Sequence, residues 1–324
     1  MELRGINFGP VWGASGVQGF FGEGYWYHKW IPGLNFKNCT FVAKTTTLAP
    51  RPGNMPLEAD GITPKEWKPK CIVVKFRKGV ALNAVGLSGP GAMALLDTGR
   101  WQARTKPFFL SFMSVEKTAE SRQEELRVFV RLLRAYLPEF KAPVGLQINY
   151  SCPNVGLHVE ELVTEVCQGL KIASALEIPL VPKFNVLLPV EAAREIARDP
   201  NCDALCNSNT IPWGALPELI DWKGLFGSDE SPLKEYGGGG LSGRPLMRLT
   251  QGWVAQARAA GITKPINAGG GIMYPEDVDI LMWAGASSVF VGSVAMLRGW
   301  RVRSIIRQAH AYVVEKARAE KTYA

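Results

Sequence analysis

Short apolar runs alternate along this chain with longer segments whose apolar positions recur three and four residues apart. The short runs are typical of buried parallel strands, and the wider spacing is typical of amphipathic helices. The predicted strands are 11–16, 41–44, 107–112, 144–149, 180–184, 204–210, 265–268 and 288–291. The predicted helices are 121–137, 159–176, 190–197, 246–260, 275–283 and 302–313, with a long loop over 211–240. A capping box at Ser121 and Glu124 is predicted to begin the first helix. This alternation predicts an α/β fold, a (β/α)8 TIM barrel.

Some segments do not fit the alternation. Residues 71–87 predict a small excursion hairpin on the face where the barrel strands end, and the basic segment 65–78 favours a solvated loop or hairpin. Residues 20–36 are crowded with aromatic side chains, and their glycines and Pro32 argue against a regular helix. We interpret this segment as a covered excursion packed over the domain, and a membrane- or partner-docking segment is the alternative. No repeat or linker separates two units, so a single domain over residues 1–324 is predicted.

Polar residues and glycines gather where the predicted strands end. The residues in these positions are Lys44, Asn149, Lys183, Asn209, Gly270 and Gly292. Because a barrel places its active site at the carboxyl ends of its strands, we expect one site to hold them. Lys44 ends an apolar strand and needs an anionic or polar partner, since an unpaired buried charge is unfavourable.

Residues 149–154, Asn-Tyr-Ser-Cys-Pro-Asn, place a thiol between two amides directly after a predicted strand. This concentration of polar groups predicts a reaction site, and a turn with a buried, inert cysteine is the alternative. A free thiol titrates near about 8.5 and is mostly protonated at neutral pH. Cys152 therefore needs lysine or amide donors nearby if it is to act as a base. We interpret His158 as a surface or helix-start residue rather than as its helper.

Two glycine loops follow the last two predicted strands, at residues 269–271 and 292–293. In barrels this is the usual phosphate site, because backbone N–H groups there approach an anion without side-chain obstruction. Residues 241–243 offer further N–H donors, and plain turns are the alternative reading of all three stretches. A phosphate-bearing cofactor, strand-end lysines and a loop thiol together indicate a flavin enzyme. A Rossmann glycine pattern is not found near the N-terminus.

Composition and charge narrow the class of protein. The chain has 324 residues and 47% hydrophobic content, and no apolar run approaches the roughly 18 residues of a membrane helix. The N-terminus lacks the apolar core of a signal peptide, so we expect a cytoplasmic protein with reduced cysteines. The six cysteines and three histidines lack zinc-binding spacing. The net charge of +8 permits nucleic-acid binding and equally suits an enzyme that handles anions.

The ordered set of motifs resembles the dihydroorotate dehydrogenase family. The matching segments are Ala14-Ser15-Gly16, Lys44-Thr45-Thr46-Thr47, Arg51-x-Gly53-Asn54, Asn83-x-x-Gly86-Leu87, Asn149-x-Ser151-Cys152-Pro153-Asn154, Lys183, Asn209-Thr210, Gly240-Leu241-Ser242-Gly243, Gly269-Gly270-Gly271-Ile272 and Gly292-Ser293. They cover nearly the whole chain in order, and the order makes the set much more specific than the cysteine motif alone.

The resemblance implies an FMN-bearing barrel that oxidises (S)-dihydroorotate to orotate in pyrimidine biosynthesis. It implies that Cys152 removes the proton from C5 while hydride leaves C6 for flavin N5, with Lys44 beside the flavin. The implied substrate ligands are Asn83, Asn149, Asn154, Asn209 and Thr210. The implied FMN ligands are Ala14, Ser15, Lys44, Thr45, Asn149, Lys183, Gly243, Gly270, Gly271, Gly292 and Ser293.

The resemblance also sets expectations about class and partners. Soluble class 1 members carry Cys where membrane-linked class 2 members carry Ser, so a class 1-like protein is expected. We expect a small-molecule substrate, no nucleic acid, no integral membrane segment, a homodimer and an electron-transfer partner subunit. Residues 55–60 depart from the family's usual run, and the segments 20–36 and 65–78 are unusual. These departures leave the electron acceptor open among fumarate, NAD through a partner subunit, and a quinone.

Three other functions fit parts of the sequence. A dihydropyrimidine dehydrogenase-type flavoprotein has a similar cysteine loop, and an RNA dihydrouridine synthase-like enzyme would suit the net charge of +8. A flavin-binding scaffold that has lost its chemistry is the non-enzymatic alternative. The complete asparagine set and the Cys152-Pro153-Asn154 ending favour dihydroorotate over these.

Overall fold

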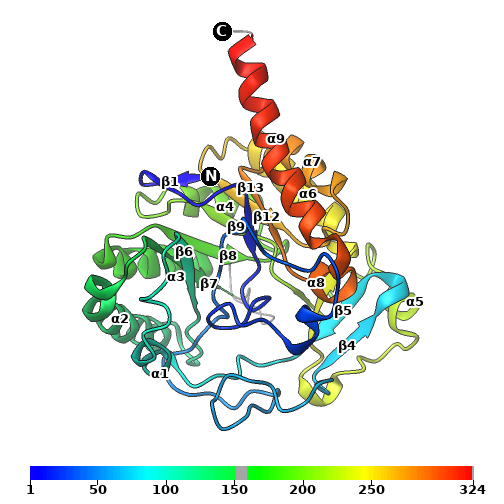
Figure 1. Ribbon diagram of the computed structural model, residues 1–324, viewed down its shortest axis with the longest axis horizontal. Coiled ribbons are helices and arrows are strands. Elements are labelled where there is room, and N and C mark those ends of the chain that lie inside the picture. The colour runs from blue at the N-terminus through cyan, green and yellow to red at the C-terminus, as the bar shows by residue number, and fades with distance from the viewer. Residues whose placement is uncertain (151–158, 323–324) are drawn as a thin grey trace.

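A parallel sheet of seven strands forms the centre of the computed structural model, which describes residues 1–150 and 159–322 (Figure 1). Its strand order is β3-β13-β12-β9-β8-β7-β6, and all neighbouring pairs are parallel. The strands are β3 (Val11–Gly13), β6 (Phe108–Phe112), β7 (Val144–Asn149), β8 (Leu180–Phe184), β9 (Leu205–Asn207), β12 (Ile266–Gly269) and β13 (Ser288–Val291). The sheet curls, and helices lie along its outside (Figure 1). The predicted α/β class is confirmed, although β9 is shorter than the predicted 204–210.

The predicted strand 41–44 is not a regular strand. Isolated parallel bridges join its region to both edges of the sheet, and they pair Thr40 with Trp12, Val42 with Phe109, and Thr46 with Phe112. Residues 40–46 therefore lie between β3 and β6. The ladder is interrupted because the Lys44 backbone N–H donates to the Gly19 carbonyl at 2.9 Å, which belongs to a loop rather than to a strand.

A second, antiparallel sheet has the strand order β10-β11-β5-β4. Its strands are β4 (Ile72–Lys75), β5 (Val80–Asn83), β10 (Ile211–Pro212) and β11 (Gly240–Gly243). β4 and β5 pair antiparallel within the segment for which the sequence predicts a hairpin. The segment predicted as a long loop over 211–240 also contains short elements, among them β10 and α5 (Trp222–Phe226). Its apolar side chains gain burial by packing on Val80 and Leu82 of β5.

Six of the α-helices correspond to the predicted amphipathic segments, and the last of them extends beyond its predicted end at residue 313. The α-helices are α1 (Ala92–Asp97), α2 (Ala119–Tyr136), α3 (Val159–Ala173), α4 (Val190–Arg198), α6 (Pro245–Ala259), α7 (Glu276–Trp283), α8 (Val294–Leu297) and α9 (Val302–Thr322). Shorter elements are β1 (Glu2–Leu3), β2 (Ile6–Asn7), and the 3-10 helices η1 (Trp26–Lys29), η2 (Phe76–Lys78), η3 (Leu137–Glu139), η4 (Ser174–Leu176), η5 (Lys234–Tyr236) and η6 (Gly299–Arg301). None of the helices in the described residues is long and apolar enough to cross a membrane.

The capping box predicted at Ser121 and Glu124 is wrong by one turn. The helix begins at Ala119, so Thr118 is its N-cap and Ser121 takes the position three residues into the helix. The Ser121 N–H donates to the Thr118 hydroxyl at 3.2 Å, and the Thr118 N–H donates to the Ser121 hydroxyl at 3.2 Å. A serine thus replaces the usual glutamate of the motif.

Aromatic side chains fill the inside of the curled sheet at one end. The Phe109 ring lies 4.3 Å from that of Phe8 and 4.4 Å from that of Trp12, and all three side chains are fully buried. They form one cluster with Val42, Val181 and other buried residues from the strands. A larger cluster lies between the strands and the helices and includes Phe129 of α2. Polar side chains lie instead at the carboxyl ends of the strands, outside these two apolar clusters.

Gly169 of α3 is predicted to be essential for the packing of Tyr150, the residue that follows β7. A Cβ atom at Gly169 would collide with the Tyr150 hydroxyl oxygen but would lie at an ordinary 3.4 Å from its ring carbon Cζ. We expect Gly169→Ala to lower the free energy of unfolding by about 1–3 kcal/mol in urea titrations, because a buried site is overpacked. Adding Tyr150→Phe removes the colliding oxygen and should recover most of the loss.

The matched control is Gly252→Ala in α6, where a Cβ atom meets nothing within 4 Å. That substitution should raise stability by roughly 0.5–1 kcal/mol, the usual gain for alanine over glycine within a helix. A stabilising effect of Gly169→Ala, equal to that of Gly252→Ala, would contradict the predicted contact.

Candidate functional site

The carboxyl ends of neighbouring strands place Asn149 and Lys183 side by side. Asn149 of β7 is the register partner of Lys183 of β8, which in turn is the register partner of Cys206 of β9. The Tyr150 N–H donates to the Lys183 carbonyl at 3.0 Å and extends this alignment beyond the last strand residue. The expectation that strand-end polar residues share one edge of the sheet is met for these two side chains.

Three of the predicted substrate residues form a connected group, made by the side-chain amides of Asn149 and Asn209 and the backbone N–H of Thr210. The Asn209 side-chain N–H donates to the Asn149 side-chain oxygen at 2.8 Å, and the Asn209 side-chain oxygen accepts from the Thr210 N–H at 2.9 Å. The Asn83 side-chain N–H donates to the Gly240 carbonyl at 3.4 Å. A Cβ atom at Gly240 would collide with the Thr210 hydroxyl, so Asn83 and Thr210 both lie against Gly240.

The Lys44 side chain is buried beneath the aromatic segment. Its ammonium donates to the Ser88 carbonyl at 2.6 Å and lies 4.7 Å from the centre of the Phe20 ring. Burial lowers the pKa of Lys44 to about 8, and the Glu23 carboxylate opposes this shift. The polar partner expected for Lys44 is therefore a backbone carbonyl together with a nearby carboxylate. A lysine with this pKa is still mostly cationic at neutral pH.

A short chain of hydroxyls lies beside Lys44. The Ser15 hydroxyl donates to the Ala43 carbonyl at 2.9 Å and lies 2.7 Å from the Thr45 hydroxyl. The Thr45 hydroxyl is also 2.9 Å from that of Ser111 on β6. The predicted cofactor residues Ser15 and Thr45 are thus in contact, and Ser111 joins them from a strand that the sequence interpretation had assigned no polar role.

Lys183 is a buried cation on β8, between Asn149 of β7 and Cys206 of β9. Its ammonium lies 5.1 Å from the centre of the Phe290 ring, and within the described residues it forms no ion pair. Burial lowers the pKa of Lys183, an effect that the Cys206 thiol opposes. Burial raises the pKa of Cys206 itself to about 11, so this thiol is neutral and does not balance the lysine. An ammonium held in this way is suited to an anionic or electron-rich ligand.

The predicted phosphate loops lie close together and depend on glycine. Gly243, Gly270 and Gly271 all have positive φ angles, of 111°, 106° and 82°. A Cβ atom at Gly271 would stand 2.6 Å from the Met247 nitrogen and 2.7 Å from the Gly243 carbonyl oxygen. One at Gly292 would stand 2.9 Å from the Ala14 side chain.

The loops that contain Ala14, Gly243, Gly271 and Gly292 therefore approach one another closely, with little side chain between them. The Ala14 N–H donates to the Val291 carbonyl at 2.8 Å, and Ser293 is the N-cap of α8. This arrangement fits the phosphate of a flavin mononucleotide, since it offers N–H groups and excludes side chains. The two buried lysines, Lys44 and Lys183, place positive charge at the same strand ends.

Cys152 and Asn154, together with His158, lie outside the described residues, so the structure does not describe their geometry. Of the described residues immediately before them, Asn149 belongs to the site, whereas the Tyr150 side chain packs into the core between β7 and α3. Tyr150 stacks on Phe184 with ring centres 5.8 Å apart, and burial raises the pKa of its hydroxyl.

Two buried amides near the site, Asn207 and Asn267, are not among the residues predicted from the sequence. Asn207 of β9 is fully buried, its side-chain N–H donates to the Asn185 carbonyl at 3.1 Å, and its side-chain oxygen has no hydrogen-bond partner among the described residues. Asn267 of β12 donates to the Ser288 hydroxyl at 2.7 Å and accepts from the Cys206 thiol at 3.4 Å. An amide inside an otherwise apolar strand is the signal that would have identified both, because buried amides need partners.

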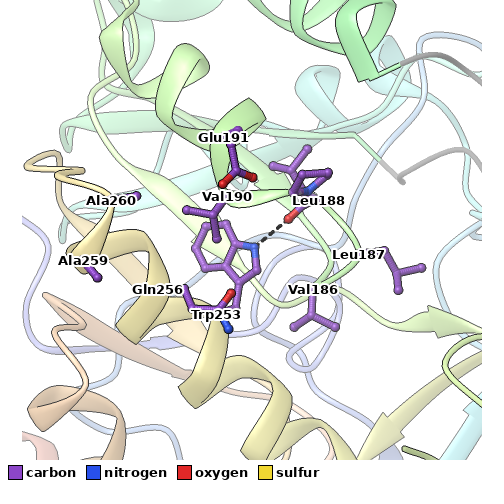
Figure 2. A pocket seen from close by; sticks show the side chains of 10 residues that line it. Val186, Leu187, Leu188, Val190, Glu191, Trp253, Gln256, Ala259 and Ala260 are labelled. Carbon is purple, nitrogen blue, oxygen red and sulfur yellow. Dashed lines mark hydrogen bonds between the residues drawn. The ribbon is translucent and has the colours of Figure 1, made fainter. Parts of the chain in front are cut away.

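A separate hollow of about 410 Å³ lies between the loop after β8 and helices α4 and α6 (Figure 2). Figure 2 shows the Trp253 indole pointing at the Leu188 carbonyl, to which it donates at 2.7 Å. Its lining is mostly apolar, with Glu191 and Gln256 as polar members, and it includes none of the predicted site residues. The hollow carries no group of catalytic side chains, so the candidate site remains at the strand ends.

Comparison with known proteins gives consistent matches. A family model described as dihydroorotate dehydrogenase matches residues 2–311. Dihydroorotate dehydrogenase A (fumarate) of Lacticaseibacillus paracasei is 31% identical over 304 residues, which are 90% of this chain and 90% of that protein. The catalytic subunit of dihydroorotate dehydrogenase B (NAD(+)) of Halalkalibacterium halodurans is 29% identical over 300 residues, 90% of this chain and 86% of that protein.

A solved structure supports the fold independently. The crystal structure of the Eimeria tenella dihydroorotate dehydrogenase in complex with ferulenol superposes with a TM-score of 0.67 at 20% identity. The superposition covers 97% of this chain and 84% of that one. At this level of identity the match concerns the α/β fold with its curled parallel sheet.

Proposed function

This chain belongs to the dihydroorotate dehydrogenase family, and on that premise we propose how its residues carry out the reaction. The protein is an oxidoreductase that oxidises dihydroorotate in pyrimidine biosynthesis, and its family is one of flavoproteins. We propose that the flavin is FMN, that the product is orotate, and that the enzyme is class 1-like with Cys152 as its base. We also propose that residues 40–46 complete an eight-stranded barrel, a single domain with the β4–β5 hairpin over its strand-end face.

We assign the FMN phosphate to the glycine loops and the isoalloxazine ring to the two buried lysines. Backbone N–H groups of Gly270, Gly271, Gly292 and Ser293 would bind the phosphate, with Gly243 and Ala14 closing the loops around it. Lys183 and Lys44 would lie along the ring with Ser15, Thr45 and Asn149. When bound, FMN accepts a hydride and so supplies the redox chemistry that no side chain can provide.

The amide group supplies the substrate ligands in this proposal. Asn149 and Asn209 already hold one another at 2.8 Å, which fixes their orientation before substrate binds. With Asn83, Asn154 and Thr210 they would bind the pyrimidine ring and its carboxylate. A ligand that lacks matching donors and acceptors leaves these amides unpaired, so a site of this kind rejects it strongly.

Cys152 is the residue that we propose to move the proton. Its thiolate would take the proton from C5, and the hydride would leave C6, so that the carbon–carbon bond becomes a double bond. The observation that carries the proposal is the contact between Asn149 and Asn209 beside Lys183, since it joins the substrate amides to the buried cation at the edge where Cys152 follows.

The experiment that tests this function is reduction of the bound flavin by substrate. The purified protein should be yellow, and its absorbance near 450 nm should bleach when dihydroorotate is added without oxygen. Dihydrouracil serves as the comparison, because it lacks the carboxylate. A flavin that does not bleach with dihydroorotate, or that bleaches equally fast with dihydrouracil, contradicts the assignment of substrate.

The electron acceptor and the assembly follow from a second stage of the same experiment. The relatives include both a fumarate-type enzyme and the catalytic subunit of an NAD-type enzyme. We propose a homodimer, with an electron-transfer partner subunit if NAD is the acceptor. Re-oxidation of the bleached protein by fumarate, by NAD or by a soluble quinone separates the acceptors, and sedimentation gives the mass of the assembly.

A further inference from the structure

Two segments that the proposed function does not use meet on the surface. The Trp26 indole N–H donates to the Trp67 carbonyl at 3.3 Å, and the two rings lie 5.9 Å apart. Trp26 belongs to the aromatic segment 20–36, and Trp67 belongs to the basic segment 65–78. The contact therefore joins the two stretches into one surface, although about forty residues separate them.

Large indole rings on this surface face solvent rather than the core. Trp26 is 54% exposed, Trp30 is 78% exposed and Trp67 is 75% exposed. The charged residues next to them in the chain are mainly lysines, and Lys29, Lys65 and Lys68 are all exposed. We call these six residues the Trp–Lys surface. Together the two segments carry seven lysine and arginine residues against two glutamates.

The exposed rings stand on a rigid base. Behind Trp26, the Tyr25 and Tyr27 rings stack at 6.0 Å with planes only 8° apart, and His28 packs edge-on against both. The Tyr25 hydroxyl donates to the Gly16 carbonyl at 2.8 Å. Because these inner side chains are already packed against one another, the exposed tryptophans are not needed to complete the core. Exposed apolar side chains of this kind mark a surface that an external partner covers.

The composition distinguishes between two kinds of partner. Protein interfaces favour tryptophan and arginine but are depleted in lysine. A membrane–water interface favours tryptophan at the headgroup level, and lysines are attracted to anionic lipid there. The cations beside these tryptophans are lysines, which fits a lipid surface better than a protein.

From this we propose that the Trp–Lys surface binds the headgroup region of an anionic phospholipid bilayer. Trp26, Trp30 and Trp67 would enter the interface, and the lysines would pair with lipid phosphates. The proposal goes beyond dihydroorotate oxidation and does not depend on it. It does place the bilayer close to the candidate site, since Gly16, the partner of Tyr25, is adjacent to Ser15 in the proposed FMN loop.

Vesicle co-sedimentation of the full-length holoprotein tests the proposal. We expect binding to phosphatidylcholine vesicles that contain about a third phosphatidylglycerol, weak binding to pure phosphatidylcholine, and release by high salt. Trp30→Ala with Trp67→Ala should lower partitioning at least tenfold, and Lys65→Glu with Lys68→Glu should do the same. Flavin absorbance in each variant reports that the protein is folded.

The chain offers a matched control in Trp283 of α7, which is 74% exposed. Trp283→Ala should bind vesicles as the parent does, and Lys316→Glu with Lys321→Glu on α9 is the corresponding control for charge. Failure of the parent to bind anionic vesicles at low salt overturns the proposal. Equal loss in the surface variants and the controls also overturns it, because binding would then reflect net charge alone. An acidic protein that occupies this surface in place of lipid would give the first of these outcomes.

Discussion

Replacement of Cys152 by alanine is expected to leave FMN bound and to slow its reduction by dihydroorotate by roughly 100- to 10,000-fold, the usual contribution of a general base. The proposed FMN ligands come from other loops, so the cofactor should remain. Hydride transfer from C6 is linked to loss of the C5 proton, and alanine cannot accept that proton. The measurement is anaerobic stopped-flow absorbance near 450 nm, with the variant and the parent at saturating dihydroorotate.

The control for this experiment is Cys167→Ala. Cys167 lies on α3, and burial raises the pKa of its thiol to about 11, which marks an inert cysteine. That variant should reduce at the parental rate. Cys152→Ser should fall between the two and should speed up at higher pH than the parent, since a hydroxyl is the weaker acid. If Cys152→Ala and the parent bleach at the same rate, Cys152 has no part in the proton transfer.

The strands that the sequence predicted best are the ones buried on both faces. Residues 144–149, 180–184 and 288–291 match β7, β8 and β13 at both ends. Each is rich in apolar residues and lacks polar/apolar alternation, because in a parallel sheet under helices both faces are covered, and even the polar members Gln147, Lys183 and Ser288 are buried.

Predictions failed where a distant segment decided the local structure. The strand expected at 41–44 is broken because Lys44 donates its N–H to Gly19, and nothing in the local pattern announces that partner. The long segment 211–240 acquires β10 because β11, which is itself paired with β5, offers it an edge. A hydrogen bond between residues far apart in the chain leaves no periodic trace in the sequence.

The candidate site likewise contains features that the sequence predicted and features that it could not predict. Lys44, Asn149, Lys183 and Asn209 could be assigned to one edge because each ends a predicted strand. The sequence could not predict two other contacts, because both depend on the register of neighbouring strands. These are the pairing of Asn209 with Asn149 and the burial of Asn207 next to Asn185. Register is set by the whole sheet, so amide contacts across strands become visible only in three dimensions.

Lys183→Met is expected to change stability and cofactor affinity in opposite directions. Methionine has a similar unbranched shape, so it fills the same space without charge. In the protein freed of flavin, the change should raise the free energy of unfolding by about 1–4 kcal/mol, because an uncompensated buried charge disappears. The affinity for FMN should fall roughly 10- to 100-fold, the effect of losing a hydrogen bond to a charged group.

The pH dependence of the free energy of unfolding is a second measurement that tests the buried charge of Lys183. Burial lowers the pKa of Lys183 in the folded state, so the unfolded chain binds more protons at any pH between that lowered value and the ordinary 10.5. Parental stability should therefore rise with pH across this window, and the advantage of Lys183→Met should shrink as the pH approaches 10.5. Lys171→Met on the exposed face of α3 is the control and should change neither quantity.

A variant that is less stable without flavin yet binds FMN as tightly as the parent would make Lys183 a structural residue. The expected result is a Lys183→Met variant that is more stable without flavin and binds FMN more weakly, and it has a direct physical meaning. In that case the Lys183 ammonium destabilises the flavin-free protein and stabilises the FMN-bound protein. Relief of the unfavourable burial of this charge then contributes to the free energy of binding an electron-rich ring. This is the expected role of an ammonium that has Phe290 and a neutral thiol as its neighbours instead of a carboxylate.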